Sequence, residues 1–323
     1  MLWLLACTGK TPAPPLADEG VPPEEPTVEA AVEEPGDLSQ REEIRFLVLG
    51  DSGYAGEDAT AVGALAAQVC EQIDCDFTLY VGDNVYPDGV QSVDDPLFQS
   101  AYEQAFGGIG VPAWMVLGNH DHRGNIQAQI DYQSPTWRMP ARHYRVPGLP
   151  EWLVLYGWDS QELLKRPDSE LSKEMLAALK SELCSTQGWA MPFAHHPNLS
   201  SGPHGHGDEL EGIRALTEPI WAECGVQASF AGHDHHLENL DKNGYLTLIS
   251  GAASKTRPVC DAEGLAKKAP CAKRGVLGQR FLSGEYGFMA MTVSETSARM
   301  DVYVLGNTEP VWGYDIAPTR STE

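Results

Sequence analysis

Five short polar clusters, each directly behind an apolar run, contain side chains of the kinds that bind metal ions. Together they supply two carboxylates, a phenol, a carboxamide and several imidazoles. The clusters occupy residues 50–53, 82–86, 118–121, 194–197 and 232–235. Two metal ions held side by side can activate water for hydrolysis. The sequence therefore predicts a two-metal hydrolase.

The charges of these side chains divide them into two unlike sets. Asp51, Asp83 and a deprotonated Tyr86 would bring three anionic oxygens to one ion. The remaining donors are neutral, namely Asn119, His195 and His233. Tyrosine has an ordinary pKa of about 10 and binds near neutral pH only beside a strong Lewis acid. One site is therefore expected to prefer a trivalent ion, with Fe(III) the natural candidate, and the other a divalent ion.

Asp83, His233 and His235 are expected to complete the two sites. A carboxylate has two oxygens, so Asp83 can bridge ions that lie roughly 3.5 to 4 Å apart. His235 then completes the first site and His233 the second. Because residues two apart in a strand share one face, we expect a turn here that sends each ring to its own ion.

Alternating strands and helices are expected to position these clusters. Apolar runs that stop at a polar cluster predict buried strands at 45–49, 77–81, 113–117, 190–193 and 226–230. Helical spacing of apolar residues predicts helices at 59–70, 95–106, 169–184 and 209–223. In such α/β sheets, ligands gather outside the carboxyl ends of the strands, so the five clusters can converge there.

Three later strands, predicted at 245–249, 287–293 and 299–305, follow without comparable helices. We expect a second sheet packed on the first. The predicted fold class is therefore α/β, with two packed mixed β-sheets flanked by helices in a four-layer α/β/β/α sandwich.

The charge balance excludes one class of partner. The 323 residues include 22 basic and 46 acidic side chains, which gives a formal net charge of -24. Nucleic acid binding requires clustered Lys and Arg against the phosphate backbone. We therefore expect no nucleic acid partner, and we expect a monomer.

The N-terminal part differs in composition from the rest. Residues 8–43 are acidic and rich in proline, which predicts a disordered tether that cannot bury enough apolar surface to fold. Residues 1–7 end in a Leu-Leu-Ala-Cys sequence that resembles a bacterial lipobox, so a lipidated Cys7 is expected to tether the chain to a membrane. The alternative is a chance apolar end with an ordinary cysteine. A catalytic domain at 44–308 and a C-terminal tail at 309–323 complete the predicted organisation.

The cysteine count fits an exported protein, either periplasmic or at the cell surface. Without Cys7, six cysteines remain, and their spacing suggests the pairs Cys70–Cys75 and Cys260–Cys271, which leaves Cys184 with Cys224. Six cysteines permit fifteen pairings, and six reduced thiols in a cytosolic protein are the alternative.

A basic stretch lies within the predicted surface loop at 254–283. Lys267, Lys268, Lys273 and Arg274 could steer an anionic substrate. The alternative, which is the commoner role of such charge runs, is a solvated loop closed by a disulfide.

The five clusters together resemble the metal-binding motifs of the purple acid phosphatases, which belong to the calcineurin-like metallophosphoesterases. The runs 118–122 and 232–235 are most similar to the tartrate-resistant type, and the resemblance extends from about residue 45 to about residue 305. It implies a ferric ion on Asp51, Asp83, Tyr86 and His235. It implies a second ion, Fe, Zn or Mn, on Asp83, Asn119, His195 and His233.

The resemblance also implies the activity, which is hydrolysis of phosphate monoesters by a metal-bound hydroxide that attacks phosphorus in line. His120 and His204 are implied as the catalytic histidines that contact the phosphate and protonate the leaving group. The chain departs from the family pattern at Ser52 and His236 and in a short stretch at 159–167, which bears on substrate range and pH optimum.

Two other functions remain open at this stage. Phosphodiesterases of the same superfamily usually have Asp-x-His in the first cluster, whereas here position 53 is glycine and Tyr86 is offered instead. A non-catalytic surface binding protein that retains the fold would be favoured by loss of a ligand or of His120, and all of these residues are present.

Overall fold

The computed structural model describes residues 36–260 and 271–318. Most of its strands form two seven-stranded mixed sheets. The first sheet contains, in spatial order, β16 (Trp312–Ile316), β15 (Ala298–Val304), β14 (Gly287–Ser294), β1 (Glu43–Leu49), β2 (Phe77–Tyr80), β3 (Ala113–Met115) and β4 (Trp137–Arg138). The second contains β13 (Gln279–Ser283), β9 (Leu237–Lys242), β10 (Tyr245–Ser250), β8 (Ala228–Ala231), β7 (Trp189–Phe193), β6 (Leu153–Trp158) and β5 (His143–Arg145).

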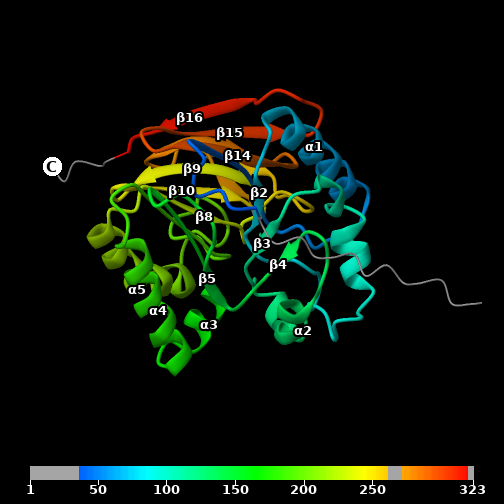
Figure 1. Cartoon of the computed structure of the whole chain (residues 1–323), viewed down its shortest axis with the longest axis horizontal. Helices are drawn as coiled ribbons and strands as arrows, with labels where there is room; N and C mark the ends of the chain where they lie inside the picture. The colour runs from blue at the N-terminus through cyan, green and yellow to red at the C-terminus, as the bar shows by residue number, and fades with distance from the viewer. Residues whose placement is uncertain (1–35, 261–270, 319–323) are drawn as a thin grey trace, which may run out of the picture. The chain divides into compact units, whose positions relative to one another are not determined.

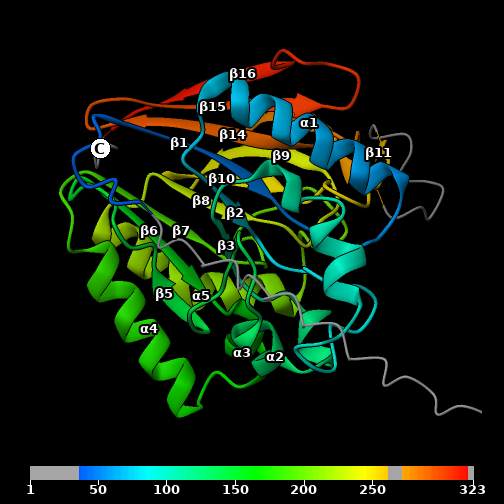
Figure 2. The same ribbon diagram turned by 45° about the vertical axis from the view of Figure 1, so that its right-hand side comes forward.

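The helices cover the outer faces of the two sheets (Figure 1). They are α1 (Glu57–Ile73), α2 (Ile126–Asp131), α3 (Ser160–Lys165), α4 (Glu170–Leu183) and α5 (Asp208–Cys224). Figure 2 shows α1 over the first sheet, with α4 and α5 on the side of the second. A short parallel pair, β11 (Val259–Cys260) with β12 (Ala272–Lys273), lies apart from both sheets.

Three clusters of buried apolar side chains define the layers. The largest lies between the sheets and includes Phe46, Trp189 and Phe230. A second cluster packs α1 against the first sheet, and a third packs α3, α4 and α5 against the second. The predicted four-layer α/β/β/α sandwich is confirmed.

The parallel strands at the centre of each sheet decide where the polar clusters lie. In the first sheet β1, β2 and β3 run parallel, and in the second β6, β7, β8 and β10 do. Each sheet therefore presents several carboxyl ends at one edge, which is where ligands bind in α/β sheets.

The helix α4 shows how the sequence forms these elements locally. The Ser169 side chain caps its first turn by accepting a hydrogen bond from the amide of Ser172. Met175, Leu179 and Leu183 follow at helical spacing and are fully buried. The predicted helix at 169–184 is therefore confirmed, with Ser169 as its N-cap.

Some elements differ from the sequence-based predictions. The later strands do not make up the second sheet by themselves, because β14 pairs antiparallel with β1 and extends the first sheet, whereas β10 joins β8 in the second. The predicted helix at 95–106 is a π-helix at Phe98–Glu103, followed by a 3-10 turn at Gly107–Ile109. Its wider turn places the Phe98 ring in a stack on Tyr132, with 3.7 Å between ring centroids.

The folded domain also extends beyond both of the boundaries predicted for the catalytic domain. The segment predicted as a C-terminal tail contains β16, which pairs with β15 over five residue positions because its apolar residues meet those of the sheet edge. At the other end, the predicted tether ends before residue 43: the Leu38 amide donates to the Gly148 carbonyl at 2.9 Å, and Leu38 packs on the central core. Cys7 and most of the tether lie outside the described residues.

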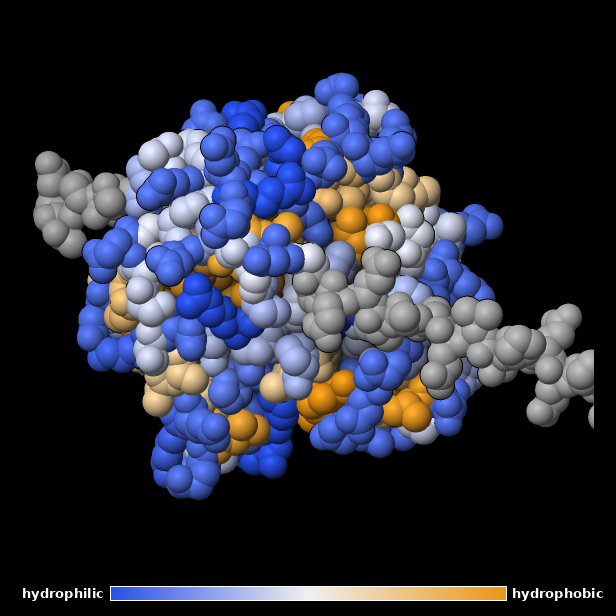
Figure 3. Space-filling model, in the orientation of Figure 1, coloured by the Kyte–Doolittle hydropathy of each residue, from blue (hydrophilic) through white to orange (hydrophobic). Residues whose placement is uncertain are grey.

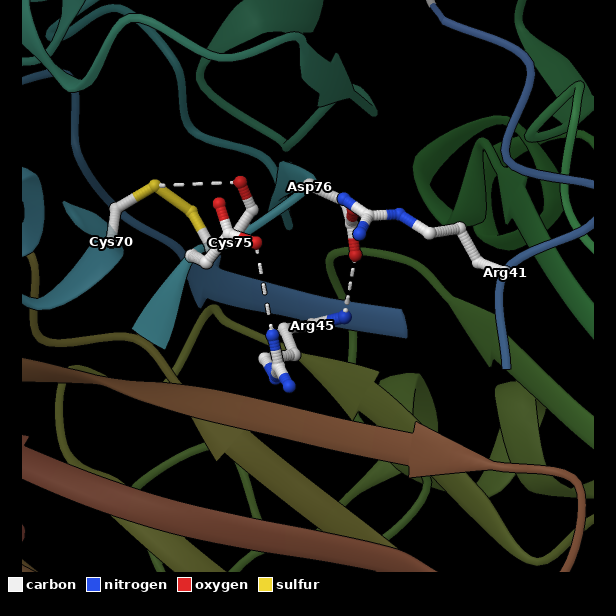
Figure 4. The surroundings of a disulfide bond; sticks show 6 residues. Arg41, Arg45, Cys70, Cys75 and Asp76 are labelled. Atoms are coloured by element: carbon white, nitrogen blue, oxygen red, sulfur yellow. Dashed lines mark hydrogen bonds and ion pairs between the residues drawn. A yellow bond between two sulfur atoms is a disulfide. The ribbon is translucent and has the colours of Figure 1, made fainter. Parts of the chain in front are cut away.

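Three disulfides join Cys70 to Cys75, Cys184 to Cys224 and Cys260 to Cys271, as the spacing suggested. Figure 4 shows the first of these beside Asp76, which accepts hydrogen bonds from the Arg45 amide at 2.8 Å and from Arg41 at 2.7 Å. The face of the molecule in Figure 3 is mainly hydrophilic, with hydrophobic residues in several small groups. Among the described residues, no helix has both the length and the apolar character that crossing a membrane requires.

Candidate metal centre

Each predicted ligand lies just past the carboxyl end of a central strand. Asp51 follows β1, Asp83 follows β2 and His233 follows β8, and all three adopt left-handed backbone angles, with φ of 54°, 55° and 69°. Such angles are costly for residues other than glycine, so they persist where the surroundings enforce them, commonly at functional sites. The sharp turns redirect the chain so that these side chains converge beyond the carboxyl ends of the strands.

Glycines allow the turns to approach one another closely. A Cβ atom added to Gly118 would overlap the amide nitrogen and the carboxylate of Asp83. A Cβ added to Gly232 would lie 2.5 Å from a carboxylate oxygen of Asp51. The turns that follow β3 and β8 can therefore approach the two carboxylates this closely only because these positions carry no side chain.

The first group of converging atoms centres on the Tyr86 phenol. Its hydroxyl oxygen lies 3.0 Å from Asp51 Oδ1, 2.9 Å from Asp83 Oδ2 and 3.4 Å from His235 Nε2. His235 Nε2 is in turn 3.3 Å from Asp51 Oδ1. The four side chains predicted for the ferric ion therefore point into one space.

The second group centres on the ring of His195. Its Nε2 lies 3.1 Å from Asn119 Oδ1, 3.1 Å from His233 Nδ1 and 3.5 Å from Asp83 Oδ1. Its other nitrogen, Nδ1, lies 2.9 Å from the Val81 carbonyl, which makes Nδ1 the protonated nitrogen and leaves a lone pair on Nε2. These are the four side chains predicted for the second ion.

Asp83 belongs to both groups through different oxygens. Its Oδ2 faces Tyr86 and its Oδ1 faces His195, so one carboxylate connects the two sets. Asp51, Asp83 and His195 also place one ligand atom each within 4.8 Å of one another. The arrangement matches a bridging carboxylate between two adjacent cations.

The electrostatics of the first group favour a bound cation. Burial, followed by the charges of Asp51 and Asp83, raises the pKa of the Tyr86 phenol well above 10. Burial alone would raise the pKa of Asp51, but contacts with His235 and other neighbours outweigh it and lower that pKa. A phenolate among two carboxylates therefore requires a strong positive charge, which a metal ion supplies.

The protonation state of His233 gives a second indication. Its Nδ1 faces His195 Nε2 in the second group, at 3.1 Å. Burial, together with the neighbouring imidazoles, holds the pKa of His233 well below 6.5. A neutral imidazole is the form that binds metals, so the donor set fits two ions, one among anionic oxygens and one among neutral donors.

Asp121 fixes the two turns that carry Asp83 and Asn119. It is fully buried and accepts hydrogen bonds from the amides of Gly118 at 2.7 Å and Asn84 at 3.1 Å. Burial and the nearby charge of Asp83 raise the pKa of Asp121 to about 6. No role for Asp121 followed from the sequence alone, although its place inside one of the polar clusters, two residues after Asn119, was a signal.

The two predicted catalytic histidines border the centre. The His120 amide donates to Asp83 Oδ1 at 2.9 Å, its ring Nδ1 is hydrogen-bonded to the Pro87 carbonyl, and its Nε2 lies 4.0 Å from Asp83 Oδ2. The His204 ring lies 4.0 Å from the His233 ring, centroid to centroid. Both imidazoles therefore line the space next to the converging ligands.

A buried network that the sequence did not reveal holds the loop that carries His204. Asp234 accepts a hydrogen bond from the His204 amide at 3.3 Å. Glu238, which is fully buried, accepts from the Ser201 amide at 3.0 Å and lies 3.0 Å from His236 Nε2. His236, one of the departures from the family pattern, therefore has a structural partner of its own.

The basic stretch of the late loop is only partly described. Lys267 and Lys268 lie outside the described residues, and Arg274 is exposed. The Lys273 amide donates to the Ser201 carbonyl at 3.0 Å, which ties this stretch to the loop of His204. Its role in steering substrates remains a prediction.

Comparisons with known proteins agree with this geometry. The family model of calcineurin-like phosphoesterases matches residues 44–237. The chain is 33% identical to tartrate-resistant acid phosphatase type 5 of Oryctolagus cuniculus over 246 residues, which cover 67% of this chain and 74% of that protein. It is 28% identical to purple acid phosphatase 3 of Arabidopsis thaliana over 300 residues, which cover 83% and 77%.

A solved structure with the same fold is GAP50, described as the anchor in the inner membrane complex of Plasmodium. It superposes with a TM-score of 0.73 and 20% sequence identity, over 87% of this chain and 90% of that one. At this identity the similarity concerns the fold alone.

Proposed function

Because this chain belongs to the calcineurin-like phosphoesterases, in their purple acid phosphatase branch, we propose that it hydrolyses phosphate monoesters at a dinuclear metal centre. The centre would hold Fe(III) on Asp51, Asp83, Tyr86 and His235. It would hold a divalent ion, Fe, Zn or Mn, on Asp83, Asn119, His195 and His233. The observation that carries this proposal is the position of the Tyr86 hydroxyl between two buried carboxylates, 3.0 Å and 2.9 Å away.

The side chains around the centre have distinct tasks in this proposal. The metal ions, when bound, supply Lewis-acid stabilisation of the phosphate charge and lower the pKa of water. His120, with Nδ1 held by the Pro87 carbonyl, presents Nε2 to the phosphate oxygens. His204 stands beside His233 and donates the proton that the leaving alkoxide needs.

The nearest alternative is a phosphodiesterase of the same superfamily. Gly53 occupies the position at which such enzymes usually carry a metal-binding histidine, and the space is filled by backbone, since a Cβ added to Gly53 would lie 2.5 Å from the Asn84 carbonyl carbon and the Val85 Cα. Tyr86 supplies the extra ligand instead. This favours the monoesterase.

One preparation of the purified protein tests the proposal. We expect two metal ions per chain, including iron, and a visible charge-transfer band from tyrosinate to Fe(III). We expect faster turnover of p-nitrophenyl phosphate than of its bis-ester. Tyr86→Phe should remove the visible band, whereas Tyr54→Phe, which alters a neighbouring exposed ring, should retain it. A colourless zinc protein that prefers the diester would contradict the proposal, and a protein that binds both metals without hydrolysing either ester would indicate a binding protein.

The three disulfides support an exported location, since such bonds persist mainly in oxidising compartments. We propose a periplasmic or cell-surface enzyme that acts as a monomer, with a lipid on Cys7 as its membrane tether and no nucleic acid partner. Mass spectrometry of the protein from its native membrane fraction tests the lipid, and its mass in solution tests the monomer.

A further inference from the structure

The segment at 254–257 lies a few residues after the end of β10 at Ser250 and borders the candidate metal centre. At its start, the Ser254 hydroxyl donates to the Asp51 carbonyl at 2.5 Å and accepts from the Tyr54 amide at 3.0 Å. At its end, the Arg257 amide donates to the His235 carbonyl at 2.7 Å. Both ends of the segment are therefore fixed to turns that carry predicted ligands, so its side chains have defined places beside the centre.

Two of these side chains are cations. Lys255 Nζ lies 5.2 Å from the centre of the Tyr86 ring and 5.3 Å from that of Tyr54. Arg257 lies at the other end of the segment, where its amide is hydrogen-bonded to the His235 carbonyl. One cation therefore borders the Tyr86 ring and the other lies beside the turn that carries His235.

Neither cation is neutralised by the part of the chain that the structure describes. No carboxylate in residues 36–260 and 271–318 forms an ion pair with Lys255 or Arg257. Arg257 Nε is buried and has no hydrogen-bond partner there. A buried donor without an acceptor costs about 1 to 3 kcal/mol, so such a group calls for a ligand. Within the described residues, two cations without a carboxylate partner stand out, because the chain has a net charge of -24 and many acidic side chains.

We propose that Lys255 and Arg257 form an anion subsite beside the metal centre, which binds a second acidic group on the leaving-group side of the substrate. This rests on the proposed phosphomonoesterase function. The guanidinium offers a planar fork that pairs with two oxygens of a phosphate or carboxylate, and the ammonium adds a point charge. The preferred substrates are therefore phosphomonoesters that carry a second phosphate or a carboxylate. Tyr54, which is 49% exposed and lies beside Lys255, forms the outer edge of this subsite.

Paired substrates test the subsite directly. Glycerol 3-phosphate and 3-phosphoglycerate are both esters of a primary alcohol but differ by a carboxylate, and fructose 6-phosphate and fructose 1,6-bisphosphate differ by a phosphate. We would measure kcat/KM of the metal-loaded wild type, Lys255→Met, Arg257→Gln and the double variant. Lys173→Met is the matched control, because it removes an exposed lysine on α4 that pairs with Glu170.

In the double variant, we expect kcat/KM for the doubly acidic member of a pair to fall at least 10-fold more than for its partner. The pair that shows the larger selective loss identifies the second group as carboxylate or phosphate. The control should change neither ratio. Equal losses for both members of each pair, or an unchanged ratio, would overturn the subsite while the phosphatase activity of the wild type stands.

A binding measurement separates this proposal from the proposed function. Calorimetry with 3-phosphonopropionate and with propylphosphonate, two phosphonates that are not hydrolysed, reports the contribution of the carboxylate without turnover. We expect the wild type to bind 3-phosphonopropionate at least 10-fold more tightly and the double variant to lose this preference. A wild type that hydrolyses no monoester would refute the proposed function, yet the same selective binding would still support the subsite. Equal affinity of the wild type for both phosphonates would refute the subsite.

Discussion

Asp159 offers a sharp test of how the structure holds the segment that follows β6. Its side chain is fully buried and accepts hydrogen bonds from Arg142 Nε at 2.8 Å and from the Glu162 amide at 2.9 Å, and it lies 2.9 Å from His122 Nε2. It therefore caps α3 and joins this helix to the turn that follows His120. We choose Asp159→Asn, which keeps the shape and the capping ability of the side chain but removes its charge.

The expected change in the free energy of unfolding follows from the ion pair with Asp159 that Arg142 loses. Leaving a buried charge without its partner costs about 3 to 5 kcal/mol. Arg142 keeps a second contact with Glu162 at 3.0 Å, and its side chain is 21% exposed, so the loss falls below that range. We expect Asp159→Asn to lower the free energy of unfolding by about 2 to 3 kcal/mol at pH 7.

The pH dependence has a definite sign. Burial alone would raise the pKa of Asp159, but His122, Arg142 and the Glu162 amide outweigh it and hold the pKa below 3.8. A carboxyl whose pKa is lower in the folded state stabilises the fold above its unfolded pKa and loses this effect as the pH falls through the folded pKa. The difference between wild type and Asp159→Asn should therefore shrink as the pH falls below 3.8.

Urea unfolding, followed by tryptophan fluorescence and far-UV circular dichroism, measures this difference. Both proteins are compared at equal metal content so that metal binding cancels. Asp168→Asn, an exposed aspartate on the same segment, should change stability by less than about 0.5 kcal/mol at every pH. A loss below about 1 kcal/mol at pH 7, or a loss that persists unchanged at pH 3, would refute this account of the network.

Three further changes test the site and the fold. His204→Ala should lower kcat for alkyl phosphates by about 100-fold or more and for p-nitrophenyl phosphate far less, because a good leaving group needs no acid; equal losses would remove His204 from that role. Gly118→Ala should reduce the metal content found by elemental analysis, because its Cβ would overlap the bridging carboxylate, whereas Gly212→Ala on α5 should keep the metal and raise the melting temperature slightly. Replacing Cys184 and Cys224 with Ser opens a disulfide that spans 40 positions and should lower the free energy of unfolding by about 4 kcal/mol in urea titrations; a change below about 1 kcal/mol would show that this bond does not restrain the unfolded chain.

The sequence was sufficient to predict the central strands and the convergence of the polar side chains beyond them for a physical reason. A parallel strand must be apolar throughout because both of its faces are covered, so a polar cluster at its end stands out. Asp51 and Asp83 follow such runs in the first sheet and His195 follows one in the second, and the central parallel strands of each sheet end at one edge. Local sequence therefore indicated a convergence of residues that lie far apart in the chain.

The strand order could not be predicted in the same way. β1 and β14 are both apolar runs, and nothing in either run states that they pair antiparallel with each other rather than in separate sheets. The π-helix at Phe98–Glu103 is equally hidden, because its buried residues Phe98, Ala101 and Tyr102 also fit α-helical spacing. In both cases the conformation depends on contacts with other segments of the chain. Those segments are distant in sequence.

Lys255 and Arg257 show where functional prediction from local sequence ends. Each ligand could be recognised because its chemistry is specific to metals and its position follows a strand, but an isolated Lys or Arg in a loop is usually only solvated. The proposed role of Lys255 and Arg257 depends on two features of the fold. β10 lies beside β8, and the segment after β10 is hydrogen-bonded to the turns of Asp51 and His235. Residues that select the substrate can therefore lie outside every motif, while the motifs alone define the reaction. Family resemblance accordingly predicts the chemistry of this centre, whereas the proposed preference for doubly acidic esters rests on the contacts of the 254–257 segment.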